Sequence, residues 1–245
     1  MSPLAKRRFV ILAAPRSGSN MLCSMLDSHP DILCHHELFN PSGIFYALPL
    51  RDSDSQASQE MQGRMQERDR DPLAFLAEQV WQRHGEKSVV GFKMTYQQNL
   101  AVFQAVLAAP EIQKIVLRRN NAVKSYVSKL VAEQSGVWED YGQARRHEPL
   151  QLELNLEHLQ QDLAFNQRYY ALIETSLRDT QQAYLQVQYE HLMDCACQRT
   201  MLDYLACQYV PLHTRSRKQN PSDLRQRVKN YGQILEQCQD PDLHA

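Results

Sequence analysis

A polar loop that follows an apolar run is the part of this sequence best suited to binding an anion. Residues 9–14 are apolar, and they lead into a turn-forming set: Pro15, Arg16, Ser17, Gly18, Ser19 and Asn20. Arginine forks onto phosphate or sulfate oxygens, serine hydroxyls donate further bonds, and glycine allows close backbone approach. A helix beginning here would add its N-terminal N–H groups. The loop predicts an anion site, with an ordinary capped turn as the alternative.

The loop lacks the ending of a nucleoside triphosphatase P-loop. That ending is Gly-Lys followed by Ser or Thr, whose hydroxyl binds magnesium, and no Gly-Lys pair occurs in the chain. A phosphosulfate is a different anion that such a loop could bind. Its transferred group carries less charge than the terminal phosphate of a triphosphate, so donors from the protein could stabilise that group without a metal. We therefore expect an anion site that needs no metal ion.

Two adjacent arginines end a second apolar run. Residues 114–118 are strand-like, and Arg118 and Arg119 stand before Asn120 and Asn121. Open α/β sheets bind ligands at the carboxyl ends of their strands, so this pair could hold a second phosphate. The alternative is a solvated strand end followed by an asparagine helix cap.

The order of predicted elements indicates the fold class. Helical patterns at 21–26 and 152–177 alternate with strand-like runs at 9–14, 88–94, 114–118 and 183–189. Such alternation favours parallel strands joined by right-handed crossovers. We predict an α/β protein with a P-loop-like, three-layer α/β/α fold and a central, mostly parallel sheet. Residues 1–245 would form a single domain, with a flexible, solvated insert at about 51–71.

Composition restricts the class of protein. The chain has 27 basic and 28 acidic residues, a balance that argues against nucleic acid as a partner. The apolar run at 9–14 is far shorter than the roughly 20 residues of a membrane span, so we expect no integral membrane segment. Six cysteines without zinc-site spacing indicate reduced thiols and a cytoplasmic protein. A homodimer is the default oligomer.

Together, the two arginine-bearing segments and the basic stretch 217–221 resemble the PAPS-dependent sulfotransferase family (PAPS is 3'-phosphoadenosine 5'-phosphosulfate). The first matches the family's 5'-phosphosulfate loop, and the second its 3'-phosphate segment. Within the family, the sequence is most similar to the bacterial lipopolysaccharide or Nod-factor-type branch, which includes trehalose sulfotransferases. The likeness extends to residues 28–30, 36–39, 91–94 and 187–192.

The resemblance implies transfer of a sulfuryl group from PAPS to a hydroxyl of a carbohydrate, glycolipid or other small molecule, leaving PAP (3',5'-bisphosphoadenosine). The 5'-phosphosulfate would be wrapped by Arg16, Ser17, Gly18, Ser19 and Asn20, with Arg16 stabilising the leaving oxygen. The 3'-phosphate would be held by Arg119 and Ser128, and closed over by Arg217 and Lys218. The family usually has one residue fewer between its arginine and serine, so Arg118 and Ser125 remain alternatives.

The reaction needs a base, because an alcohol is a poor nucleophile until a positioned group accepts its proton. By resemblance to the trehalose branch, Glu37 is the first choice, and nearby cations would keep it ionised. His36 or His35 is the second choice, since imidazole titrates near neutrality. Lys93, at the end of a predicted strand, could neutralise charge beside the sulfuryl group, or be structural.

The sequence is also compatible with two other functions. One is a P-loop kinase or nucleotide hydrolase, which would need magnesium and an acidic ligand. The other is a non-catalytic adenine-nucleotide-binding protein. Trp81 and Trp138 lie in partly apolar stretches that we predict to be helical, and we expect both to pack in the core rather than against a sugar.

Overall fold

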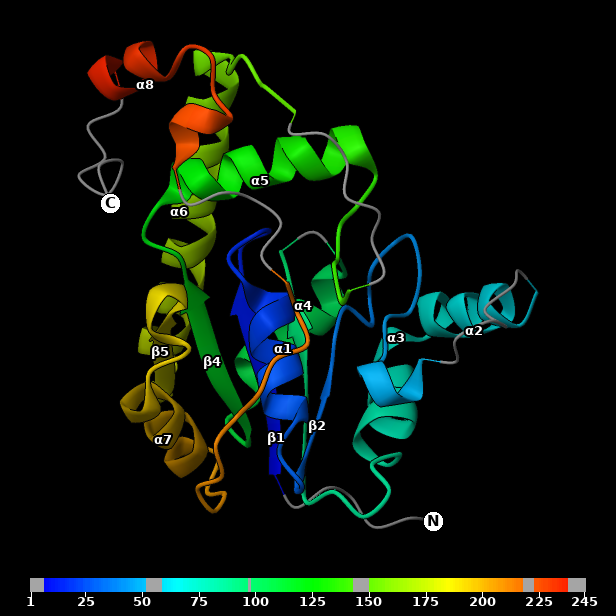
Figure 1. Ribbon diagram of the computed structural model, residues 1–245. Helices are drawn as coiled ribbons and strands as arrows, with labels where there is room; N and C mark the ends of the chain where they lie inside the picture. The colour runs from blue at the N-terminus through cyan, green and yellow to red at the C-terminus, as the bar shows by residue number, and fades with distance from the viewer. Residues whose placement is uncertain (1–6, 52–58, 97, 143–149, 218–222, 238–245) are drawn as a thin grey trace.

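The computed structural model describes residues 7–51, 59–96, 98–142, 150–217 and 223–237 (Figure 1). Within these ranges five strands form a sheet in the order β2-β3-β1-β4-β5, and all four neighbouring pairs are parallel. The strands are β1 (Arg7–Ala13), β2 (Ile32–His35), β3 (Val89–Met94), β4 (Ile112–Arg118) and β5 (Tyr184–Gln188). The prediction of an α/β fold with a parallel sheet is confirmed.

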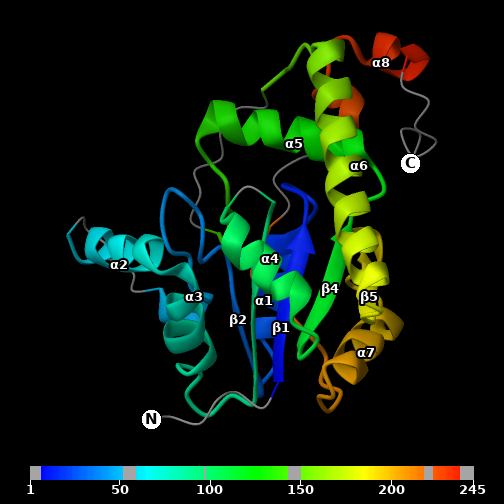
Figure 2. The same ribbon diagram turned by 180° about the vertical axis from the view of Figure 1, so that it is seen from behind.

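Helices cover both faces of the sheet, as the views from the front and from behind show (Figures 1 and 2). One face carries α1 (Ser19–Asp27) and α7 (Cys195–Tyr204). The other carries α4 (Leu100–Ala108), α6 (Leu156–Asp179) and the short α3 (Pro72–Phe75), which continues as a π-helical turn, Leu76–Trp81. The remaining helices are α2 (Gln59–Arg70), α5 (Ala122–Ser135), α8 (Tyr231–Gln237) and 3₁₀ turns at Leu48–Leu50, Tyr189–His191 and Leu224–Gln226.

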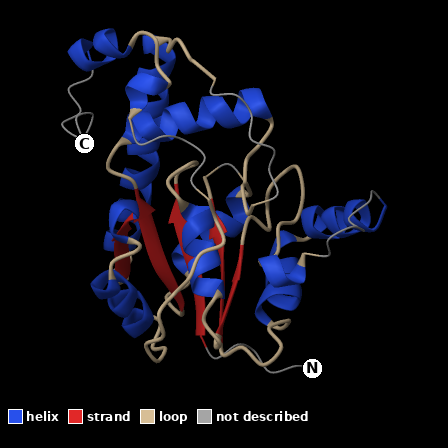
Figure 3. Ribbon diagram, in the orientation of Figure 1, coloured by secondary structure: helices blue, strands red, loops and turns tan. Residues whose placement is uncertain are grey.

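The apolar run that follows Arg8 forms the central strand because both faces of β1 are covered. Phe9 and Ile11 pack on the side of α1 and α7, whereas Val10 and Leu12 pack on the side of α4 and α6. Alternation of side chains along a strand places successive residues on opposite faces, so a continuous apolar run suits a strand buried on both sides. Figure 3 shows the resulting layers of helix, sheet and helix.

The segment expected to be a solvated insert contains a helix. Residues 59–70 form the helix α2, an element that their composition did not predict, and residues 52–58 lie outside the described residues. Met61 and Met65 pack against the core cluster, and Arg68 is only 2% exposed. Nη1 of Arg68 lies 3.0, 2.9 and 3.0 Å from the carbonyl oxygens of Leu38, Asn40 and Gly43. Tertiary contacts of a few residues thus order a segment whose composition is that of a solvated loop.

We expect Arg68→Met to lower the free energy of unfolding by about 2–3 kcal/mol, because buried carbonyls would lose their donor. Arg64→Met is the matched control: Arg64 is exposed on the same helix and pairs with Glu60, so its loss should cost under about 0.5 kcal/mol. Urea unfolding of both variants measures the difference. Equal losses of unfolding free energy in the two variants would contradict a role for Arg68 in holding the loop at residues 38–43.

The described residues include no helix that is both long and apolar enough to cross a membrane.

Candidate active site

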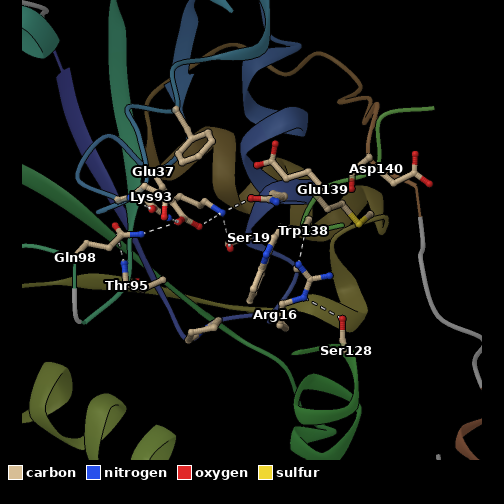
Figure 4. A pocket seen from close by; sticks show the side chains of 18 of the residues that line it. Arg16, Ser19, Glu37, Lys93, Thr95, Gln98, Ser128, Trp138, Glu139 and Asp140 are labelled. Carbon is tan, nitrogen blue, oxygen red and sulfur yellow. Dashed lines mark hydrogen bonds and ion pairs between the residues drawn. The ribbon is translucent and has the colours of Figure 1, made fainter. Parts of the chain in front are cut away.

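A cavity of about 910 Å³ lies at the carboxyl ends of the central strands (Figure 4). Its wall joins the loop after β1, the start of α1, the ends of β3 and β4 and the segment after α5. One end is lined by Arg16, Gly18, Ser19, Asn20, Arg119, Ser128, Tyr189 and Arg217. The other is lined by Glu37, Asn40, Phe45, Lys93, Thr95 and Gln98, while Trp138 and Glu139 line the cavity on the side of Arg16, which donates a hydrogen bond to the Trp138 carbonyl. The fold therefore brings most of the predicted site residues to one place.

The turn between β1 and α1 is shaped as an open cradle. Arg16 and Gly18 have positive φ angles of 63° and 91°, and Gly18 stands at the N-cap of α1, where no described side chain caps the helix. A Cβ on Gly18 would lie 2.1 Å from Cδ2 of Tyr189. Since the first N–H groups of a helix lack intrahelical partners, this end is suited to an anion. Ser17 does not line the cavity; its hydroxyl donates to the Ala14 carbonyl at 2.8 Å.

Two guanidinium groups face this cradle. Nε of Arg16 donates to the Ser128 hydroxyl at 3.0 Å, and its Nη1 donates to the Trp138 carbonyl at 2.6 Å. Arg119 donates to the Arg16 carbonyl at 3.3 Å, and its guanidinium lies 4.7 Å from the centre of the Tyr189 ring. Burial, and then the charge of Arg119, lowers the pKa of Arg16. The pKa of Arg119 is also lowered by burial. Two mutually repelling cations would be stabilised by an anion between them.

Arg118 and Ser125, the alternatives to Arg119 and Ser128 as ligands of the second phosphate, do not line the cavity. Arg118 pairs with Glu174, and its guanidinium lies 4.3 Å from the Tyr170 ring centre. Arg119 and Ser128, in contrast, both line the cavity.

Arg217 lines the cavity, and its backbone N–H donates to the Asp140 carbonyl at 2.8 Å. Lys218 lies outside the described residues.

Glu37 is an ionised carboxylate held by three donors at the other end of the cavity. Lys93 Nζ lies 2.7 Å from its Oε1, while Asn40 Nδ2 and Gln98 Nε2 lie 2.6 and 2.8 Å from its Oε2. Burial would raise the pKa of Glu37, but Lys93, Asn40 and Arg16 together lower it below the usual range. The carboxylate is thus able to accept a proton at neutral pH.

Lys93 connects the two ends of the cavity. It is buried at the end of β3, and its ammonium group donates to Asn20 and lies 3.4 Å from the Ser19 hydroxyl as well as against Glu37. The cation therefore stands between the helix N-terminus and the carboxylate, as Figure 4 shows.

The two histidines do not line the cavity. His35 accepts the Ala47 N–H, and burial lowers its pKa to about 3. His36 is fully buried, and burial, followed by the charges of Lys93 and Arg51, lowers its pKa well below the usual value. Its Nδ1 lies 3.4 Å from Asn20 Oδ1 and 3.6 Å from Glu139. Both rings are neutral at physiological pH and support the wall behind Glu37.

Several cavity residues carry no sequence signal of their own. Trp81 packs in the core as expected, but the same expectation is wrong for Trp138, which is 48% exposed, lies outside any helix and lines the cavity. The segment that carries it is held by Arg16 and by Glu139, whose Oε2 lies 2.6 Å from Arg51 Nη1. Among the cavity residues named here that the sequence did not single out, Tyr189 lies in a stretch, 187–192, that resembles the sulfotransferase family, and that resemblance could have indicated it. The others reach the cavity through loop contacts that one sequence does not reveal.

Among the described residues, no three His, Cys, Asp or Glu side chains are grouped so that they could hold a metal ion. Independence of metal stays a prediction.

A protein-family model described as "Sulfotransferase family" matches residues 8–201. Nodulation protein H of Rhizobium meliloti (strain 1021) is 26% identical to this chain, over 95% of the chain and 92% of that protein. Nodulation protein H of Rhizobium tropici is 25% identical, over 92% of the chain and 87% of that protein.

Among solved structures, the crystal structure of a sulfotransferase from Alicyclobacillus acidocaldarius resembles the fold. Its TM-score is 0.50 at 16% identity, covering 95% of this chain and 93% of that one.

Proposed function

This chain belongs to the sulfotransferase family, and from that premise we propose that it transfers a sulfuryl group from PAPS to a hydroxyl of a carbohydrate, glycolipid or other small molecule. The observation that carries the proposal is the shared cavity. A cationic cradle at a helix N-terminus and an ionised Glu37 line the same space, with Lys93 between them.

The cradle fits the phosphosulfate end of the donor. Gly18 leaves its backbone bare there, because a Cβ at position 18 would collide with the Tyr189 ring, and Arg16 and Arg119 line the same part of the cavity. Ser19, Asn20 and the first N–H groups of α1 would bind oxygens of the 5' end, while Arg119 and Ser128 would bind the 3'-phosphate. Charge-assisted bonds from guanidinium to phosphate are among the strongest that proteins make. Arg217, which also lines the cavity, would add a further cation.

PAPS supplies a sulfuryl group bonded through oxygen to a phosphate that can leave. Transfer forms a bond between the acceptor oxygen and sulfur while the bond from sulfur to the phosphate oxygen breaks. Glu37 takes the hydroxyl proton, which makes the acceptor oxygen a better nucleophile. Arg16 faces the electron pair that leaves on the phosphate oxygen, and Lys93 neutralises charge around the sulfuryl oxygens.

The acceptor end suits a polyhydroxylated molecule. The rings of Phe45 and Trp138 offer apolar faces to the cavity, and the carboxylates of Glu37 and Glu139 can accept bonds from hydroxyls. Apolar surface with a few placed polar groups is the usual composition of a small-molecule site. These features support the proposal of a carbohydrate-like acceptor.

Binding of PAP in the presence of EDTA tests the donor. We expect calorimetry to show metal-independent binding, and Arg119→Ala to weaken it about 10- to 100-fold, as loss of a charge-assisted bond predicts. Arg118→Ala is the matched control, because that side chain pairs with Glu174 outside the cavity. Its affinity should stay within about twofold of native.

Other outcomes would redirect the proposal. Absence of PAP binding together with magnesium-dependent binding of ATP would favour a kinase or nucleotide hydrolase. PAP binding without turnover on any acceptor would favour a non-catalytic binding protein. A larger effect at Arg118 than at Arg119 would reassign the 3'-phosphate.

A further inference from the structure

We propose that Asn40 and Gln98 are positioning residues that occupy both hydrogen-bonding sites of Glu37 Oε2 and so leave Oε1, beside Lys93, as the atom that accepts the proton. This inference rests on the proposed role of Glu37 as the base. It adds two residues to the reaction that the sequence did not indicate, and it assigns the proton to one oxygen.

The count of hydrogen bonds supports the assignment. A carboxylate offers about two acceptor sites on each oxygen. On Oε2 both are used, by Asn40 Nδ2 at 2.6 Å and Gln98 Nε2 at 2.8 Å. On Oε1 the described residues supply one donor, Lys93 Nζ at 2.7 Å. One acceptor site on Oε1 therefore remains for a substrate hydroxyl.

The backbone fixes which atom of each amide faces Glu37. Asn40 Oδ1 accepts the Ser42 N–H at 2.8 Å, and Gln98 Oε1 lies 3.4 Å from the Thr95 N–H. Because each carbonyl oxygen already faces a backbone donor, each NH₂ group faces the carboxylate, and a flipped amide would lose both contacts. The loop around Asn40 is itself held by the buried Arg68.

This arrangement gives the proton transfer a direction. Lys93 contacts Oε1 and also reaches Ser19 and Asn20 at the start of α1. A hydroxyl bonded to the remaining site on Oε1 would thus lie near the cation and the proposed sulfuryl position. The amides turn the other oxygen away from the reaction and prevent the carboxylate from rotating.

The charged and titratable groups facing Glu37 determine how its protonation should respond. They come from four elements: Lys93 on β3, Arg16 in the loop after β1, the neutral His36 that precedes Glu37 in the chain, and Tyr141 after α5. Glu139, also after α5, lies near Arg16 and His36. The amide donors stabilise the ionised form together with Lys93 and Arg16. Removing one donor should therefore raise the pKa of Glu37, and base activity should fail at a higher pH.

The test is a ¹³C NMR titration of the Glu37 carboxyl carbon in the full chain without ligand, with the signal assigned by its loss in Glu37→Gln. We expect Gln98→Leu and Asn40→Leu each to raise its pKa by about one unit. Asn166→Leu is the matched control: Asn166 also bonds a carboxylate, Asp162 Oδ2 at 3.1 Å, but on α6 outside the cavity. It should leave the pKa of Glu37 unchanged.

An unchanged pKa in the folded Gln98 and Asn40 variants would overturn the inference. If the leucine variants do not fold, Gln98→Glu keeps the size of the side chain and should raise the pKa through a second carboxylate; no rise would again overturn it. Because this titration needs neither donor nor acceptor, its failure is distinct from failure of the proposed function, which PAP binding decides. Once an acceptor is found, the acidic limb of kcat/KM should shift upward in the same variants, with the KM for PAPS unchanged.

Discussion

Glu37→Gln should reduce kcat by roughly 10²- to 10⁴-fold, the usual contribution of a positioned general base. The amide has nearly the same shape but cannot accept a proton, so affinity for PAP should stay close to native. The native carboxylate has a lowered pKa because Lys93, Asn40 and Arg16 outweigh its burial. Activity should therefore be present above that pKa and be lost as the pH falls through it. Transfer of labelled sulfate from PAPS to a panel of sugars measures the effect.

Two comparisons make this result specific to Glu37. Glu111→Gln removes a carboxylate that lies near Arg8 away from the cavity, and it should leave turnover unchanged. His36→Gln tests the alternative base. Turnover that survives in Glu37→Gln but is abolished in His36→Gln would transfer the role of base to the histidine.

Gly18→Ala should lower the free energy of unfolding by about 2–4 kcal/mol and weaken PAP binding at least about tenfold. An alanine would be strained at a φ of 91°, and its methyl carbon would lie 2.1 Å from the Tyr189 ring. If Tyr189 moves to make room, Arg119 loses the ring on which it lies. Thermal unfolding and PAP calorimetry measure the two effects.

Gly63→Ala is the control for adding a methyl group. Gly63 lies inside α2, and nothing approaches its added carbon within 4 Å. Since alanine is the better helix former, the variant should be more stable by about 0.5–1 kcal/mol. Native stability and PAP affinity in Gly18→Ala would show that the cradle does not depend on this close approach.

The sequence was sufficient to predict the framework of the fold. The run after Arg8 is apolar at successive positions, a pattern typical of a strand buried on both faces, and β1 lies at the centre of the sheet. The β1–α1 loop could be recognised because few residue types form such a turn. By contrast, β2 has only four residues, and its apolar character was too brief to distinguish from a buried loop.

Long-range contacts account for what the sequence could not show. The helix at 59–70 is held because Arg68 is buried and two half-buried methionines pack against distant parts of the chain, a contribution that composition does not reveal. Trp138 resembles a core residue by type, yet the loop that carries it is held at the cavity by contacts with Arg16 and Arg51.

The sequence by itself determined the chemical groups available to this protein: a glycine turn, arginines at the end of a predicted strand, a lysine in another predicted strand, and a carboxylate at position 37. Only the tertiary structure decided which of them meet. Arg118 and Arg119 are neighbours in the chain, but only Arg119 reaches the cavity. Asn40 and Gln98 come from separate loops and converge on one oxygen of Glu37. The physical reason is that sequence patterns record local preferences, whereas the direction of a side chain at a loop or strand end depends on packing between distant segments.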